Sequence, residues 1–476
     1  MTYLHGVEIL EKDGFNLTIT DADISSVVVI GTMPTYSLDE VVDLPKITNY
    51  REAAKYVGNN IDGFTLPDAV ETILDESGGA NIYAINIFDE EKHSASVEKT
   101  ITFTNGECQL TELGIQKLVL KKGDETLVLD TDYSFEKSTI KILAGGKLET
   151  EQTGVSASYN YADFSKITDA DVIGGTDENG KRTGIQRVYD IIATYGVVPG
   201  IVIAPNCTSK TVRTAIEKVI ENISAFAYHD LPQGTTLEKA EKARLKATDG
   251  LDLTTISENS MIALPFVYRY NSNEDTTTLK PLSPVLAGLR IKLDRERNVA
   301  KSIDNTVSKT ILGTEFPIYF MLSDKNCDAN RLSALGITTV INHKGAYRTW
   351  GARNSSFPNK EGLMTFESAK RTRMFIKKTI QDSSFVCVGE TITRGFIDEV
   401  LNEINAKFAK WSNPIDEVNH IIYDGEAYWD ETLNTAEDLA NGKIKFPFKW
   451  CPLCVAEHIV FEDTLDISII TKTLNA

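Results

Sequence analysis

Residues 25–31 read SSVVVIG, a short and nearly continuous run of β-branched residues. Such a run is typical of a strand that is buried on both faces. Two helical segments follow, NYREAAKYVG at 49–58 and PDAVETILDESGG at 67–79, and the second begins at a proline and ends at two glycines. NIYAINIF at 81–88 is again strand-like. This order of strand, helix, helix and strand predicts an α/β layer.

Residues 97–162 have no helical periodicity and carry many strand signals. KLVLKKGDETLVLD at 117–130 is typical of a hairpin, and VSASYNYA at 155–162 alternates between two faces. We therefore predict an all-β module over 96–165, inserted into a discontinuous α/β domain of 21–95 and 166–330. Because insertions are tolerated at exposed loops, we expect this module on the molecular surface.

The α/β alternation resumes after residue 166, with helices expected at 183–195, 209–224 and 283–298. The strongest helical pattern lies at 391–411, where one apolar stripe faces a core or a partner. The stripe consists of Ile397, Val400, Leu401, Ile404, Phe408 and Trp411.

Three late segments, at 443–450, 457–462 and 465–471, are strand-like. We read 331–454 as a C-terminal domain and the two ends, 1–20 and 455–476, as extended arms. The predicted fold class is therefore mixed α/β (α+β), in several domains.

Composition excludes several classes of protein. The chain has 476 residues and a net charge of −19, which argues against a general nucleic-acid binder. It contains no run of eighteen apolar residues and no basic, apolar leader at its start. The six cysteines are scattered, as in a reduced protein. We therefore expect a protein that is made and folded in a cytoplasm and does not contact a membrane directly.

One region is basic although the chain is acidic. Between Arg331 and Ile380 there are ten Lys or Arg residues and two acids, Glu361 and Glu367. In FESAKRTRMFIKKTI, at 366–380, a helix would place Lys370, Arg373 and Lys377 on its outer face. Such a face is often only solvated, but the contrast with the rest of the chain favours an acidic partner equally well.

GTDENGKRTG, from Gly175 to Gly184, almost spells a phosphate-binding P-loop. That motif needs a Ser or Thr directly after its lysine to hold magnesium, but Arg182 follows Lys181. Two acids, Asp177 and Glu178, would also face the phosphates. We interpret the segment as a polar surface turn and expect no nucleotide or other cofactor.

Cys451 and Cys454 form a CxxC pair with His458 four residues further on. These give three potential zinc ligands, and a structural zinc site uses four. A redox pair needs its first thiol at a helix N-terminus, but the following sequence is strand-like. We favour buried cysteines in a strand and predict no metal site and no catalytic residue. The open alternative is a cytoplasmic α/β redox or metal-binding protein that uses this pair.

Several segments, in order, resemble the contractile tail sheath proteins of phages, phage-derived injection systems and bacteriocins, and most closely the short-myophage type. The resemblance covers most of the chain and fails over about 90–165. Its strongest piece surrounds Trp350, Gly351 and Arg353, and Gly175, Lys181 and Gly184 belong to a second family loop. The matching segments are HGVEIL, SSVVVIGTMP, GGTDENGKRTG, GLRIKLDRERN, LGITTVINHKGAYRTWGARNSS, FESAKRTRMFIKKTI, GFIDEVLNEINAKFAKW and NTAEDLANGKIKFPFKWCPLCVAEHIVFE.

The resemblance implies a structural polymer and not an enzyme. Sheath subunits assemble as six-fold rings or helical strands around an inner tube, and contraction drives that tube through a bacterial envelope. Extended arms at both ends add strands to the sheets of neighbouring subunits. We therefore expect residues 1–20 and about 455–476 to be disordered or misplaced in an isolated subunit.

The resemblance also implies the partners and the location of the chain. The partners are other copies of the chain, the inner tail tube, the baseplate and the tail terminator. Assembly takes place in the host cytoplasm, and the product is a virion tail, a bacteriocin or an injection particle. The basic stretch then grips an acidic tube surface through Lys370, Arg371, Arg373, Lys377 and Lys378.

Overall fold

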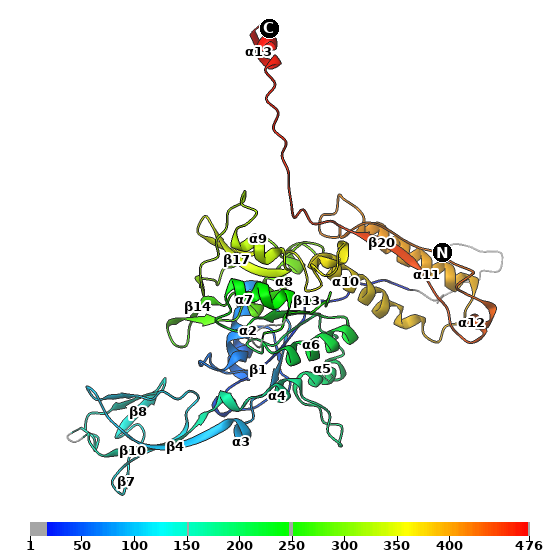
Figure 1. Cartoon of the computed structure of the whole chain (residues 1–476). Coiled ribbons are helices and arrows are strands. Elements are labelled where there is room, and N and C mark those ends of the chain that lie inside the picture. Colours follow the sequence, from blue (N-terminus) through cyan, green and yellow to red (C-terminus); the bar gives the residue numbers. More distant parts are fainter. Residues whose placement is uncertain (1–16, 150–151, 247–250, 475–476) are drawn as a thin grey trace, which may run out of the picture.

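The computed structural model describes residues 17–149, 152–246 and 251–474. Figure 1 shows a central domain, a β module that projects at the lower left, and a C-terminal lobe at the right. A long extended segment, the C-terminal arm, leads from this lobe to a short terminal helix. No helix among the described residues combines the length and the apolar character that crossing a membrane requires.

The central domain is built on one sheet with the strand order β18-β17-β13-β12-β11-β1-β3-β2. The inner strands are parallel, whereas the edge strands β2 and β18 are antiparallel to their neighbours. The bounds are β1 (Val27–Gly31), β2 (Lys46–Ile47), β3 (Ile82–Asn86), β11 (Ile201–Ile203), β12 (Phe226–Asp230), β13 (Ser260–Ala263), β17 (Ile337–His343) and β18 (Ala346–Trp350). The run at 25–31 thus supplies an inner strand, as predicted.

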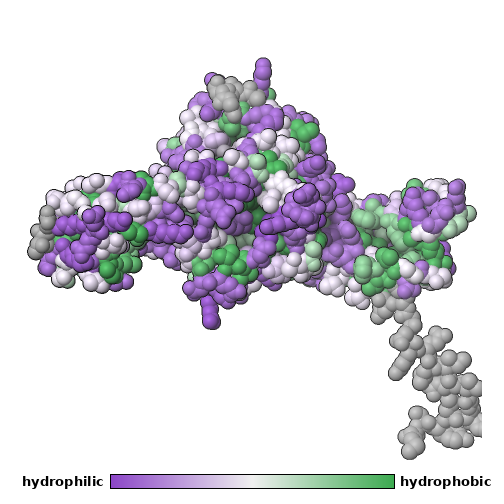
Figure 2. Space-filling model, turned by 90° about the horizontal axis from the view of Figure 1, so that it is seen from below, coloured by the Kyte–Doolittle hydropathy of each residue, from purple (hydrophilic) through white to green (hydrophobic). Residues whose placement is uncertain are grey.

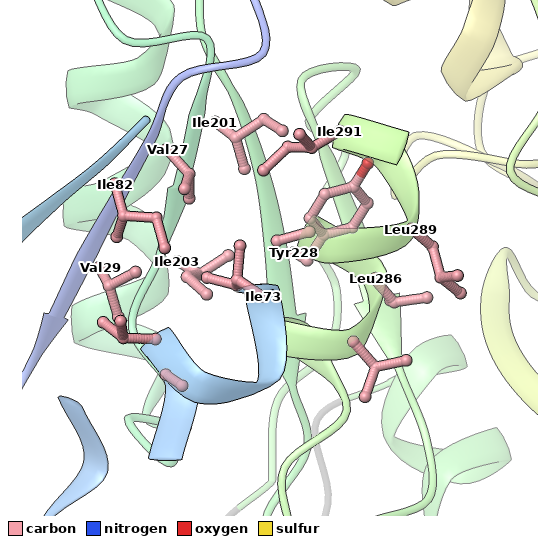
Figure 3. Close-up of a cluster of buried hydrophobic side chains, with 14 of the residues drawn as sticks. Val27, Val29, Ile73, Ile82, Ile201, Ile203, Tyr228, Leu286, Leu289 and Ile291 are labelled. Atoms are coloured by element: carbon pink, nitrogen blue, oxygen red, sulfur yellow. The ribbon is translucent and has the colours of Figure 1, made fainter. Parts of the chain in front are cut away.

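Strand β1 contributes to two cores because its alternate residues face opposite sides of the sheet. Val27 and Val29 belong to a core with residues of α2 (Thr65–Ser77) and α8 (Ser283–Glu296). Val28 and Ile30 belong to a core with residues of α5 (Val188–Tyr195) and α6 (Lys210–Ile223). Figure 3 shows the first core, where strand residues meet Ile73 and the apolar face of α8. Each fully buried side chain of this size contributes about 1.5–3 kcal/mol.

The described helices of the central domain are α1 (Tyr50–Tyr56), α2 (Thr65–Ser77), α3 (Glu90–His93), α4 (Asp169–Ile173), α5 (Val188–Tyr195), α6 (Lys210–Ile223), α7 (Leu237–Leu245), α8 (Ser283–Glu296) and α9 (Asp328–Ser333). They include the five predicted segments, which are α1, α2, α5, α6 and α8, and four that were not predicted, which are α3, α4, α7 and α9. Gly78 ends α2 with φ 69°, a left-handed conformation that glycine adopts without strain. A small sheet, β15-β14-β16, contains β14 (Val267–Asn271), β15 (Thr276–Lys280) and β16 (Gly313–Thr314).

The β module contains two sheets around its own core, which includes Leu120, Tyr133, Ile140, Val155 and Tyr159. One sheet has the order β4-β10-β6-β7 and the other β5-β9-β8. The bounds are β4 (Ser94–Ile101), β5 (Glu107–Gln109), β6 (Gln116–Lys122), β7 (Glu125–Thr126), β8 (Tyr133–Glu136), β9 (Thr139–Ile142) and β10 (Val155–Ala162). Strand β10 is the segment VSASYNYA. Val155, Ala157 and Tyr159 are buried as the alternation predicts, whereas Tyr161, expected on the same face, is only half-buried after a shift in the register with β6.

The C-terminal lobe consists of α10 (Glu367–Ser383), α11 (Arg394–Trp411), α12 (Ala436–Ala440) and the hairpin of β19 (Ile422–Ala427) and β20 (Phe448–Pro452). The apolar stripe predicted on α11 is buried or partly buried in the lobe core. The division predicted between residues 330 and 331 is crossed by the central sheet, because β17 and β18 are two of its strands.

The two chain ends differ from the prediction. Leu17 is 1% exposed, and Leu17 and Ile19 lie in the core of the C-terminal lobe, so residues 17–20 are a packed part of the subunit. The rest of the predicted N-terminal arm, residues 1–16, lies outside the described residues. At the other end, two predicted strands are absent from the subunit: residues 457–462 are extended but unpaired, and Ser468–Leu474, within the segment predicted at 465–471, forms helix α13. The Asp466 carboxylate accepts from Ser468 N at 2.9 Å at the start of this helix.

Candidate assembly surfaces

Helix α10 carries the five basic residues that were predicted to face a tube, and these residues have different environments. Arg373 and Lys377 are exposed, one helical turn apart. Lys370 is paired with Glu258 at 2.8 Å, and this bond is the main reason why the pKa of Glu258 is lowered to about 2. Lys378 donates to the backbone oxygens of Asp23 and Val198, and burial lowers its pKa.

Arg371 is 1% exposed and lies inside the subunit. Its guanidinium is 2.6 Å from Asp294 and 3.5 Å from Glu367. Arg290, which is fully buried, contacts the same two acids at 2.9 and 3.4 Å. Two cations and two anions therefore alternate between α8 and α10. Arg371 joins these helices and does not form part of a surface for a partner.

The buried ion-pair network is also hydrogen-bonded to the central sheet. Tyr228, on β12, donates its hydroxyl to Glu367 at 3.2 Å. Burial raises the pKa of Glu367, although Arg290 and Arg371 flank the carboxylate. Burial likewise raises the pKa of Tyr228. These contacts hold the first half of α10 against the central domain.

Long-range ion pairs neutralise much of the local basic charge. Besides Lys370 and Arg371, Arg331 pairs with Glu241, Arg353 with Glu457 and Lys360 with Glu258. These ion pairs could not be predicted from the sequence, because each acid lies far along the chain from its basic partner. Within the described residues, Lys344, Arg373 and Lys377 are the exposed basic residues of this region that form no ion pair, and only Arg373 and Lys377 lie on α10.

Trp350, Gly351 and Arg353, the segment in which the resemblance is strongest, lie at the end of the edge strand β18. Trp350 packs edge-on against Phe320, with ring centroids 4.7 Å apart. Gly351 has φ 131°, and its N–H donates to Asp304 at 2.8 Å. Arg353 places its guanidinium over the Phe366 ring and binds Glu457 of the C-terminal arm. This motif therefore connects the central sheet to the arm.

The loop from Gly175 to Gly184 is an exposed turn. The Asp177 carboxylate accepts from the N–H groups of Asn179 and Lys181, at 2.9 and 2.8 Å, where a P-loop would offer such groups to a phosphate. Lys181 is exposed, whereas Gly184 is buried with φ 55°. A Cβ on Gly184 would lie 2.5 Å from Gly174 N, so only glycine fits there. The segment is therefore a surface turn whose N–H groups are bound by its own Asp177 carboxylate.

The two cysteines of the CxxC pair are more exposed than predicted. Cys451 lies in strand β20, as expected, but both Cys451 and Cys454 are exposed and not buried. The alternation of β20 explains Cys451, because Lys449 and Cys451 face outward while Trp450 and Pro452 are more buried. Among the described residues, no three His, Cys, Asp or Glu side chains form a group that could hold a metal ion.

The C-terminal arm exposes a series of large apolar side chains. The exposed fraction is 67% at Val460, 91% at Phe461 and 89% at Leu465, and Ile469, Ile470 and Leu474 of α13 are exposed as well. Figure 2 shows apolar side chains gathered on the C-terminal lobe, whereas the β module at the opposite end is more mixed. Exposed apolar segments of this extent mark an interaction site or an aggregation hazard.

Residues 17–23 form a strap along α10 and α11. The backbone N–H of Leu17 donates to Glu399, and that of Ala22 to Thr379, both at 3.0 Å. The Asp21 carboxylate pairs with Lys407 at 2.9 Å and accepts from Trp411 Nε1 at 3.2 Å. The described N-terminal segment and the C-terminal arm therefore both extend from the C-terminal lobe (Figure 1).

No family model matches the chain. The chain is 30% identical over 474 residues to the tail sheath protein of Burkholderia phage BcepMu, across 97% of this chain and 96% of that protein. It is 24% identical over 379 residues to the tail sheath protein of Escherichia phage P2, across 79% and 87% of the two chains. Among solved structures, it resembles the sheath complex of an extracellular contractile injection system in the contracted state, with a TM-score of 0.63, 14% identity and coverage of 98% and 99%. Each likeness extends over most of both chains.

Proposed function

Because the chain belongs to the family of phage tail sheath proteins, we propose that it polymerises around an inner tail tube and contracts to drive that tube through a bacterial envelope. The chain is a structural protein of a contractile tail or injection particle. The alternative of a redox or metal-binding protein at Cys451 and Cys454 is wrong, because the relative that matches 97% of this chain is a tail sheath protein.

The C-terminal arm is the observation that carries the proposal. The extended segment does not bury Phe461 or Leu465 on its own subunit. The hairpin of β19 and β20 has only two strands, so each strand has one edge without a described partner. Adding a strand from another copy would satisfy those edges and cover the arm at the same time. Because such head-to-tail contacts need not close, they build a helical filament.

The exposed basic face of α10, Arg373 and Lys377, is the proposed contact with the tube. Two exposed charges give a weak contact that salt screens, which suits a sheath that must release the tube as it contracts. The β module lies at the opposite end of the molecule from the C-terminal lobe (Figure 2). If α10 faces the tube, the module therefore lies toward the outside of the sheath, as predicted for an inserted domain.

The remaining parts of the proposal follow from the family and not from a particular contact. The sheath meets the baseplate at one end and the tail terminator at the other, and subunits assemble in the host cytoplasm. The extended lattice stores the energy of contraction at assembly as a kinetically trapped state, so no nucleotide is consumed.

Electron microscopy of the purified full-length chain tests the proposal. We expect hollow, striated cylinders at high protein concentration. A variant that ends at Glu457 should remain folded and monomeric, because the side chains described beyond this residue, at 458–470 and 473–474, are all exposed. The N-terminal counterpart should remove residues 1–16 only, because Leu17 and Ile19 are part of the core. Cylinders formed by the variant that ends at Glu457 would contradict the proposed strand exchange.

A further inference from the structure

Arg353 is the side chain that holds the root of the C-terminal arm. Its Nε lies 3.1 Å from both carboxylate oxygens of Glu457, and its Nη2 lies 2.5 Å from Oε2. The guanidinium stands 3.7 Å from the ring centroid of Phe366 and 4.7 Å from that of Phe357. Its Nη1 also donates to Thr365 Oγ1 at 2.6 Å. A guanidinium bound through its fork and stacked on rings is held more firmly than an ordinary surface cation.

The backbone at Arg353 belongs to the central domain. Arg353 forms an isolated antiparallel bridge with Phe366, the residue before α10. The neighbouring Ala352 O accepts from Glu367 N at 3.0 Å. Glu367 is itself one of the buried acids between α8 and α10. The position of the Arg353 guanidinium is therefore fixed by the central sheet and by the start of α10.

Glu457 lies on the arm, beyond the end of β20 at Pro452. Past this residue, the side chains from 458 to 470 are all exposed. The bonds described there are local, such as those from Ser468 N to Asp466 and from Thr473 Oγ1 to Ile469. The pair of Arg353 and Glu457 is thus placed where the arm leaves its own subunit.

We propose that this pair is a latch that sets the direction in which the C-terminal arm leaves the subunit. The arm begins in the C-terminal lobe at β20. The latch nevertheless fixes the direction of the arm relative to the central sheet, because Arg353 is held by that sheet. The arm then starts from a defined place when it reaches a second copy of this chain, and less orientational freedom is lost on binding. This inference rests on the proposed strand exchange, and it assigns Arg353 and Glu457 as positioning residues for that exchange.

Limited proteolysis of the unassembled full-length subunit tests the latch without assembly. Glu457→Gln removes the charge and keeps the size, and Glu462→Gln makes the same change five residues further along, where the side chain is exposed. Chymotrypsin can cleave after Leu453, on the body side of the latch, and after Phe461, beyond it. We expect Glu457→Gln to speed cleavage after Leu453 about fivefold, as for a loss of one charge-assisted pair. Cleavage after Phe461 should not change, and Glu462→Gln should match the wild type at both sites.

Equal cleavage after Leu453 in the two variants would overturn the latch. Assembly provides the second readout. Glu457→Gln should need a several-fold higher protein concentration to form cylinders, Glu457→Asp should recover part of this loss, and Glu462→Gln should assemble normally. Faster cleavage with normal assembly would overturn the positioning role and leave strand exchange intact. Failure of strand exchange itself would instead appear as cylinders from the variant that ends at Glu457.

Discussion

Two arginines on α10 have opposite roles although only one residue separates them. Arg371 is buried between Asp294 and Glu367, whereas Arg373 is exposed. We expect Arg371→Met to lower the free energy of unfolding by about 3–5 kcal/mol, because it leaves two buried acids with one remaining cation. Arg373→Met should change it by less than about 0.5 kcal/mol. Urea unfolding of both variants gives the two values, and equal losses would contradict the assigned burial.

His229, on β12, gives the fold a dependence on pH. The side chain is 6% exposed, and burial together with Arg213 lowers its pKa to about 3 from 6.5. Its Nε2 also lies 3.9 Å from Glu217, whose pKa burial raises. Below pH 6.5, His229 is protonated in the unfolded chain but stays neutral in the folded chain until the pH approaches 3. This contribution to stability is therefore complete above pH 6.5 and is lost as the pH falls toward 3.

Between pH 6.5 and pH 3, the free energy of unfolding falls by about 1.4 kcal/mol per pH unit because of His229. We expect His229→Gln to unfold with a shallower pH dependence than the wild type when urea unfolding is followed from pH 7 to pH 5. Parallel curves for the two proteins would mean that His229 does not carry this effect.

At the scale of elements, the contact between α11 and β19 depends on a glycine. A Cβ on Gly425 would lie 2.8 Å from the ring of Phe408, which is fully buried. We expect Gly425→Ala to destabilise the protein by about 1–3 kcal/mol through this overpacking. Gly395, in the first turn of α11, has only a distant neighbour at 3.9 Å. Gly395→Ala should stabilise by about 0.5–1 kcal/mol. Thermal unfolding compares the pair, and a loss in both would argue against close packing at Gly425.

Elements could be predicted where the signal was local. The burial of the segment at 25–31 and of the stripe on α11 could be predicted from the spacing of their apolar residues alone. Both predictions are confirmed. Helix α13 was missed because Ile467, Ile469 and Ile470 are β-branched residues that suggest a strand, while the start of this helix depends on Asp466. The packing of Leu17 was missed because its neighbours lie on α11, far along the chain.

The candidate surface could be predicted only in part, for a related reason. Counting charges along 331–380 gives a strongly basic segment, but Asp294 and Glu258 neutralise Arg371 and Lys370 from distant elements. A single sequence carries no signal for such pairs. Helical spacing did place Arg373 and Lys377 on an outer face, and both are exposed. Their contact with a tube stays a prediction.

At the scale of the whole molecule, the net charge of −19 opposes polymerisation. Copies with this charge repel one another, and the repulsion weakens as salt shortens the Debye length from about 10 Å at 0.1 M to about 3 Å at 1 M. The proposed contact of the arm rests on its apolar side chains and backbone groups, which salt does not screen, while the acids Glu462, Asp463 and Asp466 add to the repulsion that salt relieves. The sheath should therefore assemble more readily as salt rises.

Binding to the tube should respond to salt in the opposite sense. The proposed contact through Arg373 and Lys377 is an attraction between exposed charges, and salt screens it. We expect the concentration of subunit needed for cylinders to fall between about 0.1 and 0.5 M salt, while the affinity for preformed tubes falls over the same range. Pelleting of subunit alone and of subunit with tubes measures the two. The variant Arg373→Gln, Lys377→Gln should lose the salt dependence of tube binding and keep that of self-assembly. If both dependences persist in this variant, the tube is bound through another surface.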